Sequence, residues 1–245
     1  MSASYELYDD ETWDRGEAIF DSMRDVFFNE NLYYEITRFV TKHRKGGSPM
    51  KFFPPRRGGF NFHYRIQYSD SLSTIIRFPL PGYFRMAKEK ALAEVAAIRY
   101  IANHTAIPVP FILHYGITEE SPRKLGPFII MEYIEHSGDM IDMLRTPDQA
   151  PGEKPVLDPG IEETKLECIY GQIADIMLQL AAYNFSKIGC LGLRSHDDKD
   201  NDDNDSEPDI ICRPLSYNMA QLGEAGGVPH FKLPATSKTF FSSPE

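Results

Sequence analysis

The sequence predicts an α+β fold with a small N-terminal lobe, built from an antiparallel sheet and one key helix, and a second, mainly helical lobe. Three patterns predict it. Apolar and polar residues alternate from Phe60 to Tyr68, and a second apolar stretch returns after a turn. An apolar helical stripe follows between Arg85 and Asn103, and a longer one covers Glu162 to Phe185.

The composition is that of a globular protein, with 42% apolar and 25% charged residues in 245 positions. A net charge of -10 argues against general nucleic-acid binding, which needs a basic surface. The three cysteines are widely spaced and predict reduced thiols rather than a disulfide framework or a zinc site. The N-terminus lacks signal-peptide character, and no apolar run is long enough to span a bilayer. We therefore expect a cytoplasmic protein without a membrane partner.

The first part of the chain is helical by its spacing. Apolar residues recur every three or four positions between residues 10 and 44. Six basic residues then fall between Lys42 and Arg57 among Gly and Pro. They predict a loop, which is either a solvated connector or a segment near bound phosphates. We divide the chain into an N-terminal helical extension (1–45), a first lobe (46–134) and a partial second lobe (135–245).

The strands and the long helix follow from local signals. Gly58-Gly59 opens what we expect to be the first strand, and Thr74 to Phe78 is the returning strand of a hairpin. Two further apolar strands cover 111–115 and 127–134. The helix at 162–185 has an apolar face that we expect to be buried, formed by Leu166, Ile169, Ile173, Ile176, Met177 and Leu180.

Arg77 is the first candidate functional residue, because it lies inside an apolar strand. A charge in such a strand needs a partner, since burying it alone costs several kcal/mol. Glu94 lies on or beside the buried face of the helix and is the obvious partner. Kinases use such a pair to hold the α- and β-phosphates of a nucleotide. A purely structural ion pair is the alternative.

The order of the parts adds to this pair. Gly58-Gly59 precedes it as a phosphate-covering turn would. After it, the strand GPFIIMEYIE leads into polar residues that can offer backbone groups to an adenine edge. Each signal alone is commonly structural, but together they stand in the order of a nucleotide-holding lobe.

The chain resembles the fungal branch of the aminoglycoside phosphotransferase family, which belongs to the kinase-like superfamily. The resemblance runs from about Trp13 to Pro234. It is carried by the segments GGFNFHYRI, IIRFPLPG, EKALAEVAAIRYI, HTAIPVP, LGPFIIMEYIEH, VLDP, YGQIADIMLQL, IGCLG and RPLSYNM. It implies a protein-kinase-like fold and ATP-dependent phosphorylation of a small-molecule hydroxyl, with Mg²⁺ as the expected metal. The acceptor and the oligomeric state stay open.

The resemblance also implies a set of nucleotide-binding residues. Arg77 matches the position of the usual kinase lysine, which is commonly arginine in this branch. Glu94 matches the helix glutamate, and Met131 lies at the back of the adenine pocket. The linker between lobes corresponds to Glu132, Tyr133 and Ile134. Gly58 and Gly59 complete the set.

The catalytic part of the family pattern has no counterpart in this sequence. That pattern is H-x-D with an asparagine five residues after the aspartate, followed by a metal-binding aspartate in an apolar strand. Only His196-Asp197-Asp198 has the first spacing, and Asn201 follows three residues later, in an acidic segment. We therefore expect no catalytic residue, no metal ligands, and weak or lost ATP binding, in a C-terminally truncated second lobe.

Two alternatives remain for such a chain. One is a non-catalytic nucleotide-binding or regulatory module of pseudokinase type, and the other is an incomplete product of a longer gene. A self-standing module should cover the apolar face of the 162–185 helix, whereas a fragment should leave it partly bare and prone to association. Whether the chain is an enzyme is left open.

Overall fold

The computed structural model describes residues 6–84, 86–147, 149, 153–185, 189–193 and 208–212. Contacts divide the chain into two compact units. The first unit comprises residues 1–104, 108–133 and 185–245, and the second comprises 105–107 and 134–184. The three-part division expected from the sequence stays a prediction.

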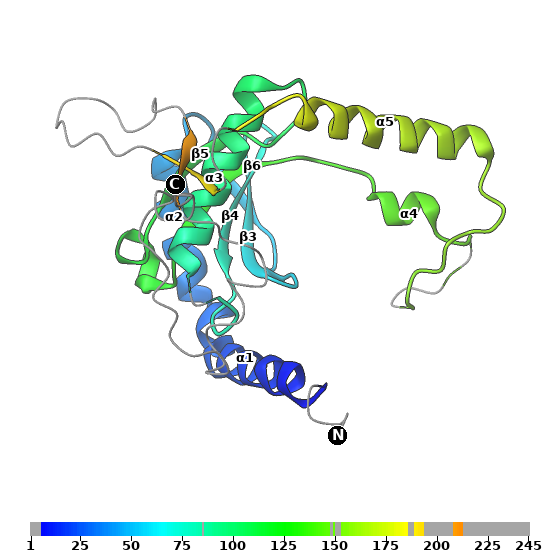
Figure 1. Cartoon of the computed structure of the whole chain (residues 1–245). Coiled ribbons are helices and arrows are strands. Elements are labelled where there is room, and N and C mark those ends of the chain that lie inside the picture. Colours follow the sequence, from blue (N-terminus) through cyan, green and yellow to red (C-terminus); the bar gives the residue numbers. More distant parts are fainter. Residues whose placement is uncertain are drawn as a thin grey trace, which may run out of the picture. The chain divides into compact units, whose positions relative to one another are not determined.

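An antiparallel sheet forms the centre of the first unit (Figure 1). Its main strands lie in the order β1-β3-β4-β6-β5, and β2 pairs with β3 beyond the end of β1. Every pairing among them is antiparallel. The bounds are β1 Pro49–Phe52, β2 Arg56–Arg57, β3 Asn61–Tyr68, β4 Ser73–Pro79, β5 Ile112–Gly116 and β6 Phe128–Tyr133.

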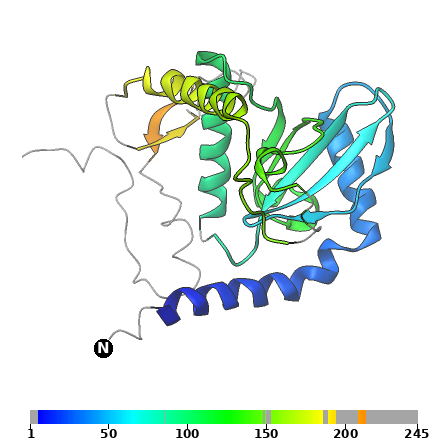
Figure 2. The same cartoon turned by 90° about the vertical axis from the view of Figure 1, so that its right-hand side faces the viewer.

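The remaining elements of this unit are three helices, two single 3-10 turns and a small second sheet. Their bounds are α1 Glu6–Phe27, α2 Glu30–His43, α3 Ala87–His104, η1 Thr118–Glu120, η2 Pro122–Lys124, β7 Cys190–Gly192 and β8 Asp209–Cys212. Figure 2 shows α2 and α3 on opposite sides of the sheet. No described helix is long and apolar enough to cross a membrane.

The strict alternation of β3 sets the two faces of the sheet. Its apolar residues are buried, and its polar residues Asn61, His63, Arg65 and Gln67 are only partly covered. The apolar side, together with buried residues of β4 and β6, packs against α1 and α2 in an aromatic-rich core. On the other side Val95 of α3 packs on Ile112, Ile129 and Met131. The pattern in the sequence therefore predicted the correct faces.

The glycine turn and the basic segment differ from expectation. Gly58-Gly59 does not open the first strand, because β1 and β2 precede it. The basic segment is not a loop either, since these two strands run through it. Arg44 donates to Asp70 at 2.5 Å, and Arg57 donates to Glu17. These arginines bind carboxylates of this unit, which sequence spacing alone could not show.

Helix α1 is held to the sheet by a charged cluster. The guanidinium of Arg57 donates to both carboxylate oxygens of Glu17 and, at 2.7 Å, to the hydroxyl of Tyr83. The Tyr83 hydroxyl in turn donates to Glu17. The hydrogen bonds from Arg57 and then Tyr83 lower the pKa of Glu17 to about 2.

This cluster predicts acid sensitivity. The folded pKa of Glu17 lies below its ordinary value of 4.5, so the stabilisation is complete above pH 4.5 and is lost as pH falls toward 2. Because the Glu17 side chain is 32% exposed, we expect only about 1–2 kcal/mol after solvent screening. Urea unfolding of wild type and Glu17→Gln should differ by this amount at pH 6, and the difference should shrink below pH 4.5 and disappear as pH approaches 2. A constant difference across that range would contradict the assignment.

Gly82 allows α1 to approach closely. Its φ is +81°, and a Cβ there would lie 2.9 Å from Cβ of Ile19 and 3.2 Å from Cα of Gly16. We expect Gly82→Ala to lower the free energy of unfolding by about 2 kcal/mol, through backbone strain and displacement of α1. Gly59→Ala is the control, because a Cβ at Gly59 meets nothing within 4 Å. Equal stability losses in both variants would refute this reading.

The second unit contains α4 Met140–Leu144 and α5 Glu163–Ala181. Lys165 Nζ donates to the carbonyl of Met143 at 2.5 Å and joins the two helices. The apolar face of α5 was expected to be buried, but that expectation was wrong. None of the described residues 134–184 is buried. Within the predicted face, Met177 and Leu180 are 65% and 45% exposed, and Leu166, Ile169 and Ile173 are only partly covered. The stripe has the correct helical period, but it is not part of a core.

Candidate functional site

Arg77 and Glu94 meet in the structure. The Arg77 guanidinium on β4 donates to the carboxylate of Glu94 on α3, and the two side chains are 25% and 29% exposed. The pair lies on the α3 side of the sheet, away from the aromatic core. Because solvent reaches both groups and screens their attraction, the ion pair contributes little to the free energy of unfolding. The Arg77 guanidinium also remains accessible to an anion.

Lys90 adds a second cation to this pair. Its ammonium lies 3.5 Å from the other carboxylate oxygen of Glu94 and 4.7 Å from the centre of the Phe84 ring. Burial lowers the pKa of Lys90, against the attraction of Glu94. One carboxylate is therefore shared by two cations, which leaves local positive charge in a chain of net charge -10.

Two further basic residues continue the site across the sheet. His63 lies opposite Arg77 in the β3–β4 ladder, and Arg56 lies opposite His63 in the β2–β3 ladder. Burial lowers the pKa of His63, and the charges of Arg56 and Arg77 act in the same direction. His63 is thus neutral at pH 7, when its imidazole can both donate and accept a hydrogen bond.

Sequence reasoning missed Lys90 and His63, and it included Arg56 only as one of six basic residues in a segment that could lie near bound phosphates. Lys90 was visible in principle, because it precedes Glu94 by one helical turn. His63 and Arg56 required the strand register, which depends on the hairpin turn and on pairing between segments far apart in the chain.

Gly58 and Gly59 form the tight turn between β2 and β3. The Gly58 N–H donates to the carbonyl of Asn61 at 2.8 Å. Neither glycine has a positive φ, and an added Cβ would meet only that same carbonyl, 3.5 Å from Gly58. The fold itself therefore does not demand glycine here. Two residues without side chains leave the backbone open to close approach by a ligand.

Met131 and Glu132 have different roles on β6. Met131 is buried and packs with Val95 and Ile112 on the α3 side. Glu132 bonds instead to the chain before β5. Its N–H donates to the carbonyl of Phe111 at 3.0 Å, and its carboxylate accepts the Phe111 N–H at 2.8 Å. The N–H and the carboxylate of Glu132 thus hold the segment that leads into the edge strand β5. The position of Glu132 in the sequence did not reveal this role.

Tyr133 lies against a stacked arginine. The Arg65 guanidinium is 3.9 Å from the centre of the Tyr133 ring and 4.1 Å from the centre of the Phe53 ring. Its Nη2 also donates to the Ser73 hydroxyl at 3.2 Å. Ile134 belongs to the second unit, as the first residue of its 134–184 segment. The three expected linker residues therefore differ. Glu132 is bonded to Phe111 through its N–H and its side chain, Tyr133 packs against Arg65, and Ile134 lies in the second unit.

The described residues offer no site that fits magnesium. Among the described positions, no group of three or more His, Cys, Asp or Glu side chains could hold a metal ion. The segment His196-Asp197-Asp198 and Asn201 lie outside the described residues.

Comparisons with known proteins give little identity. No protein-family model matches the chain, and no curated protein matches it. Among solved structures, it is similar to the GDP complex of a mutant aminoglycoside 2'-phosphotransferase-IIIa, with 14% identity and a TM-score of 0.40. The match covers 62% of this chain and 42% of that protein, less than half its length. A TM-score below 0.5 establishes neither the fold family nor the ligand of this chain.

Proposed function

We propose that the first unit binds the phosphates of a nucleotide and that the chain does not itself transfer a phosphoryl group. The Arg77–Glu94 pair carries the proposal. A guanidinium inside a strand, oriented by a helix carboxylate and still a quarter exposed, is suited to bidentate contact with phosphate oxygens. Lys90, Arg56 and the open glycine turn support the same assignment.

The class of the nucleotide and the parent chemistry come from the resemblance seen in the sequence. ATP is the expected nucleotide, and phosphorylation of a small-molecule hydroxyl is the expected parent activity. The sequence has no H-x-D with an asparagine five residues on, so it has no group to position the acceptor hydroxyl. Phosphoryl transfer depends on positioning and electrostatic stabilisation, so binding without turnover is the expected behaviour.

The test is ATP binding to the 245-residue chain by isothermal titration calorimetry, with and without Mg²⁺. We expect weak binding, little dependence on Mg²⁺, and at least tenfold lower affinity in Arg77→Ala, because a charged hydrogen bond contributes about 1.5–3 kcal/mol. Arg99→Ala, on the same unit but outside the Arg77–Glu94 pair, is the control.

Two results would overturn the proposal. Equal ATP affinity of wild type and Arg77→Ala would remove the phosphate site. Production of ADP from Mg-ATP by the purified chain, lost on Arg77→Ala, would show that the chain is an active phosphotransferase after all.

A further inference from the structure

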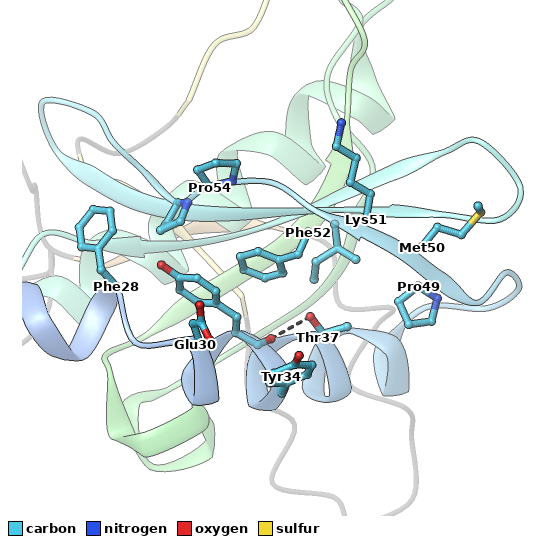
Figure 3. Close-up of a pocket in the computed structure, with 12 residues that line it drawn as sticks. Phe28, Glu30, Tyr34, Thr37, Pro49, Met50, Lys51, Phe52 and Pro54 are labelled. Carbon is cyan, nitrogen blue, oxygen red and sulfur yellow. Dashed lines mark hydrogen bonds between the residues drawn. The ribbon is translucent and has the colours of Figure 1, made fainter.

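A cavity of about 630 Å³ lies on the other side of the sheet, between α2 and β1. Figure 3 shows it as an elongated space, with Phe28 at one end and Pro49 and Met50 at the other. Helix α2 runs along one side, and the strand carrying Phe52 runs along the opposite side. Its volume is in the range of sites for drug-sized ligands. It is separate from Arg77, which lies on the α3 side.

Aromatic and apolar side chains make most of the lining. Tyr33 and Phe52 stack with ring centres 4.7 Å apart, and this pair closes the core behind the cavity. Tyr34 is 77% exposed, and its ring makes no aromatic contact among the described residues. Such rings offer electron-rich faces, to which organic cations bind more strongly than neutral apolar groups of the same shape.

The polar side chains of the cavity, apart from Lys51, are one carboxylate, one threonine hydroxyl and two tyrosine hydroxyls. Glu30 is exposed, and its carboxylate has neither an ion pair nor a hydrogen bond within the described part of the chain. The Thr37 hydroxyl donates its proton to the carbonyl of Tyr33 at 2.8 Å, so it can only accept a further bond. The tyrosine hydroxyls of 33 and 34 have no hydrogen-bond partner among the residues described.

The one cation of the lining is directed elsewhere. The Lys51 side chain points away from α2 (Figure 3), and its ammonium lies 4.5 Å from the centre of the Phe53 ring. The charge of the cavity is therefore set by the Glu30 carboxylate and the aromatic faces, with neutral hydroxyls beside them. This combination complements a positive charge attached to an apolar body.

We propose that this cavity binds a hydrophobic organic cation, an amine or quaternary ammonium on an apolar skeleton, with Glu30 and the aromatic rings as the recognition elements. The carboxylate supplies charge complementarity, and the rings supply contact area with cation–π attraction. Arg77, Glu94 and Lys90 are not among its lining residues, so this cavity and the proposed phosphate site are formed by different side chains.

The test compares two probes of the same shape by NMR titration of the full chain. Benzyltrimethylammonium carries the charge, and neopentylbenzene is its neutral carbon isostere. We expect benzyltrimethylammonium to shift resonances of Thr37 and Met50 and to bind at least fivefold more tightly than neopentylbenzene. Benzoate, the anionic probe, should cause no shifts at these residues.

Three variants locate the effect. Glu30→Gln should weaken benzyltrimethylammonium five- to tenfold, and Tyr34→Ala should weaken it about threefold. Glu119→Gln, an exposed glutamate of η1 outside the cavity, should leave the affinity unchanged. Circular dichroism verifies that each variant is folded, and neopentylbenzene serves as an internal check that Glu30→Gln keeps the cavity intact.

Several outcomes would overturn the proposal. Equal binding of the neutral isostere would mean a purely apolar cavity, and unchanged affinity in Glu30→Gln would mean that the carboxylate plays no part. Tighter binding of benzoate, lost in Lys51→Gln, would reverse the sign of the ligand. Absence of any shift at millimolar benzyltrimethylammonium would show that the cavity does not bind this class.

Discussion

Phe62→Ala is expected to lower the free energy of unfolding by about 3–5 kcal/mol, the largest stability effect that we predict for this chain. Phe62 is fully buried on β3. Its ring packs against two phenylalanine rings of α1 and against Phe28, which follows that helix. The centres are 4.7 Å from Phe27, 5.7 Å from Phe28 and 6.1 Å from Phe20. Removing the ring leaves a cavity where β3 and α1 join.

The neighbouring hydrogen bond increases the expected loss. The Tyr64 hydroxyl donates to the carbonyl of Phe27 at 2.9 Å inside the same core. If Phe27 moves into the space left by Phe62, that buried hydroxyl loses its acceptor, which costs free energy.

Equilibrium urea unfolding followed by circular dichroism measures the effect. Phe111→Ala is the matched control, because the Phe111 side chain is 66% exposed and its hydrogen bonds with Glu132 use only backbone groups of Phe111. We expect that control to change stability by less than about 0.5 kcal/mol. A loss below 1 kcal/mol for Phe62→Ala would show that α1 does not pack on β3 in this way.

The sheet could be predicted from the sequence because its signal is local. Alternation in residues 60–68 depends only on which side each residue faces, so it identified Phe62 and Tyr64 as core. The same argument placed Arg77 in a buried strand and assigned Glu94 as its partner. The structure brings these two side chains together.

The parts that could not be predicted depend on contacts between distant segments. The arginines at 44 and 57 looked like a solvated loop, yet they bind Asp70 and Glu17, 26 and 40 residues away in sequence. The cavity on α2 also requires β1, which has no alternation long enough to identify it.

The exposed face of α5 shows a second limit of sequence patterns. Periodicity shows that a helix has an apolar side, but it does not show what covers that side. Ile176, Met177 and Leu180 of that side are 39%, 65% and 45% exposed. Exposed apolar patches of this kind commonly associate with other surfaces.

Glu94→Gln tests whether the ion pair exists for ligand binding or only for structure. We expect this variant to weaken ATP binding about tenfold, because an uncharged amide no longer orients the Arg77 guanidinium toward the phosphates. The double variant Arg77→Ala/Glu94→Gln should bind no more weakly than Arg77→Ala alone, since Glu94 acts through Arg77. Titration calorimetry of all three variants and wild type completes the cycle.

The stability of the same variants distinguishes the two roles. Both side chains are partly exposed, so a pair kept for binding should contribute less than about 1 kcal/mol to the free energy of unfolding. Glu89→Gln, an exposed glutamate of the same helix, is the control for a charge change on α3. If Glu94→Gln lowers the unfolding free energy by several kcal/mol while ATP affinity stays at the wild-type value, the pair is structural and the nucleotide assignment fails.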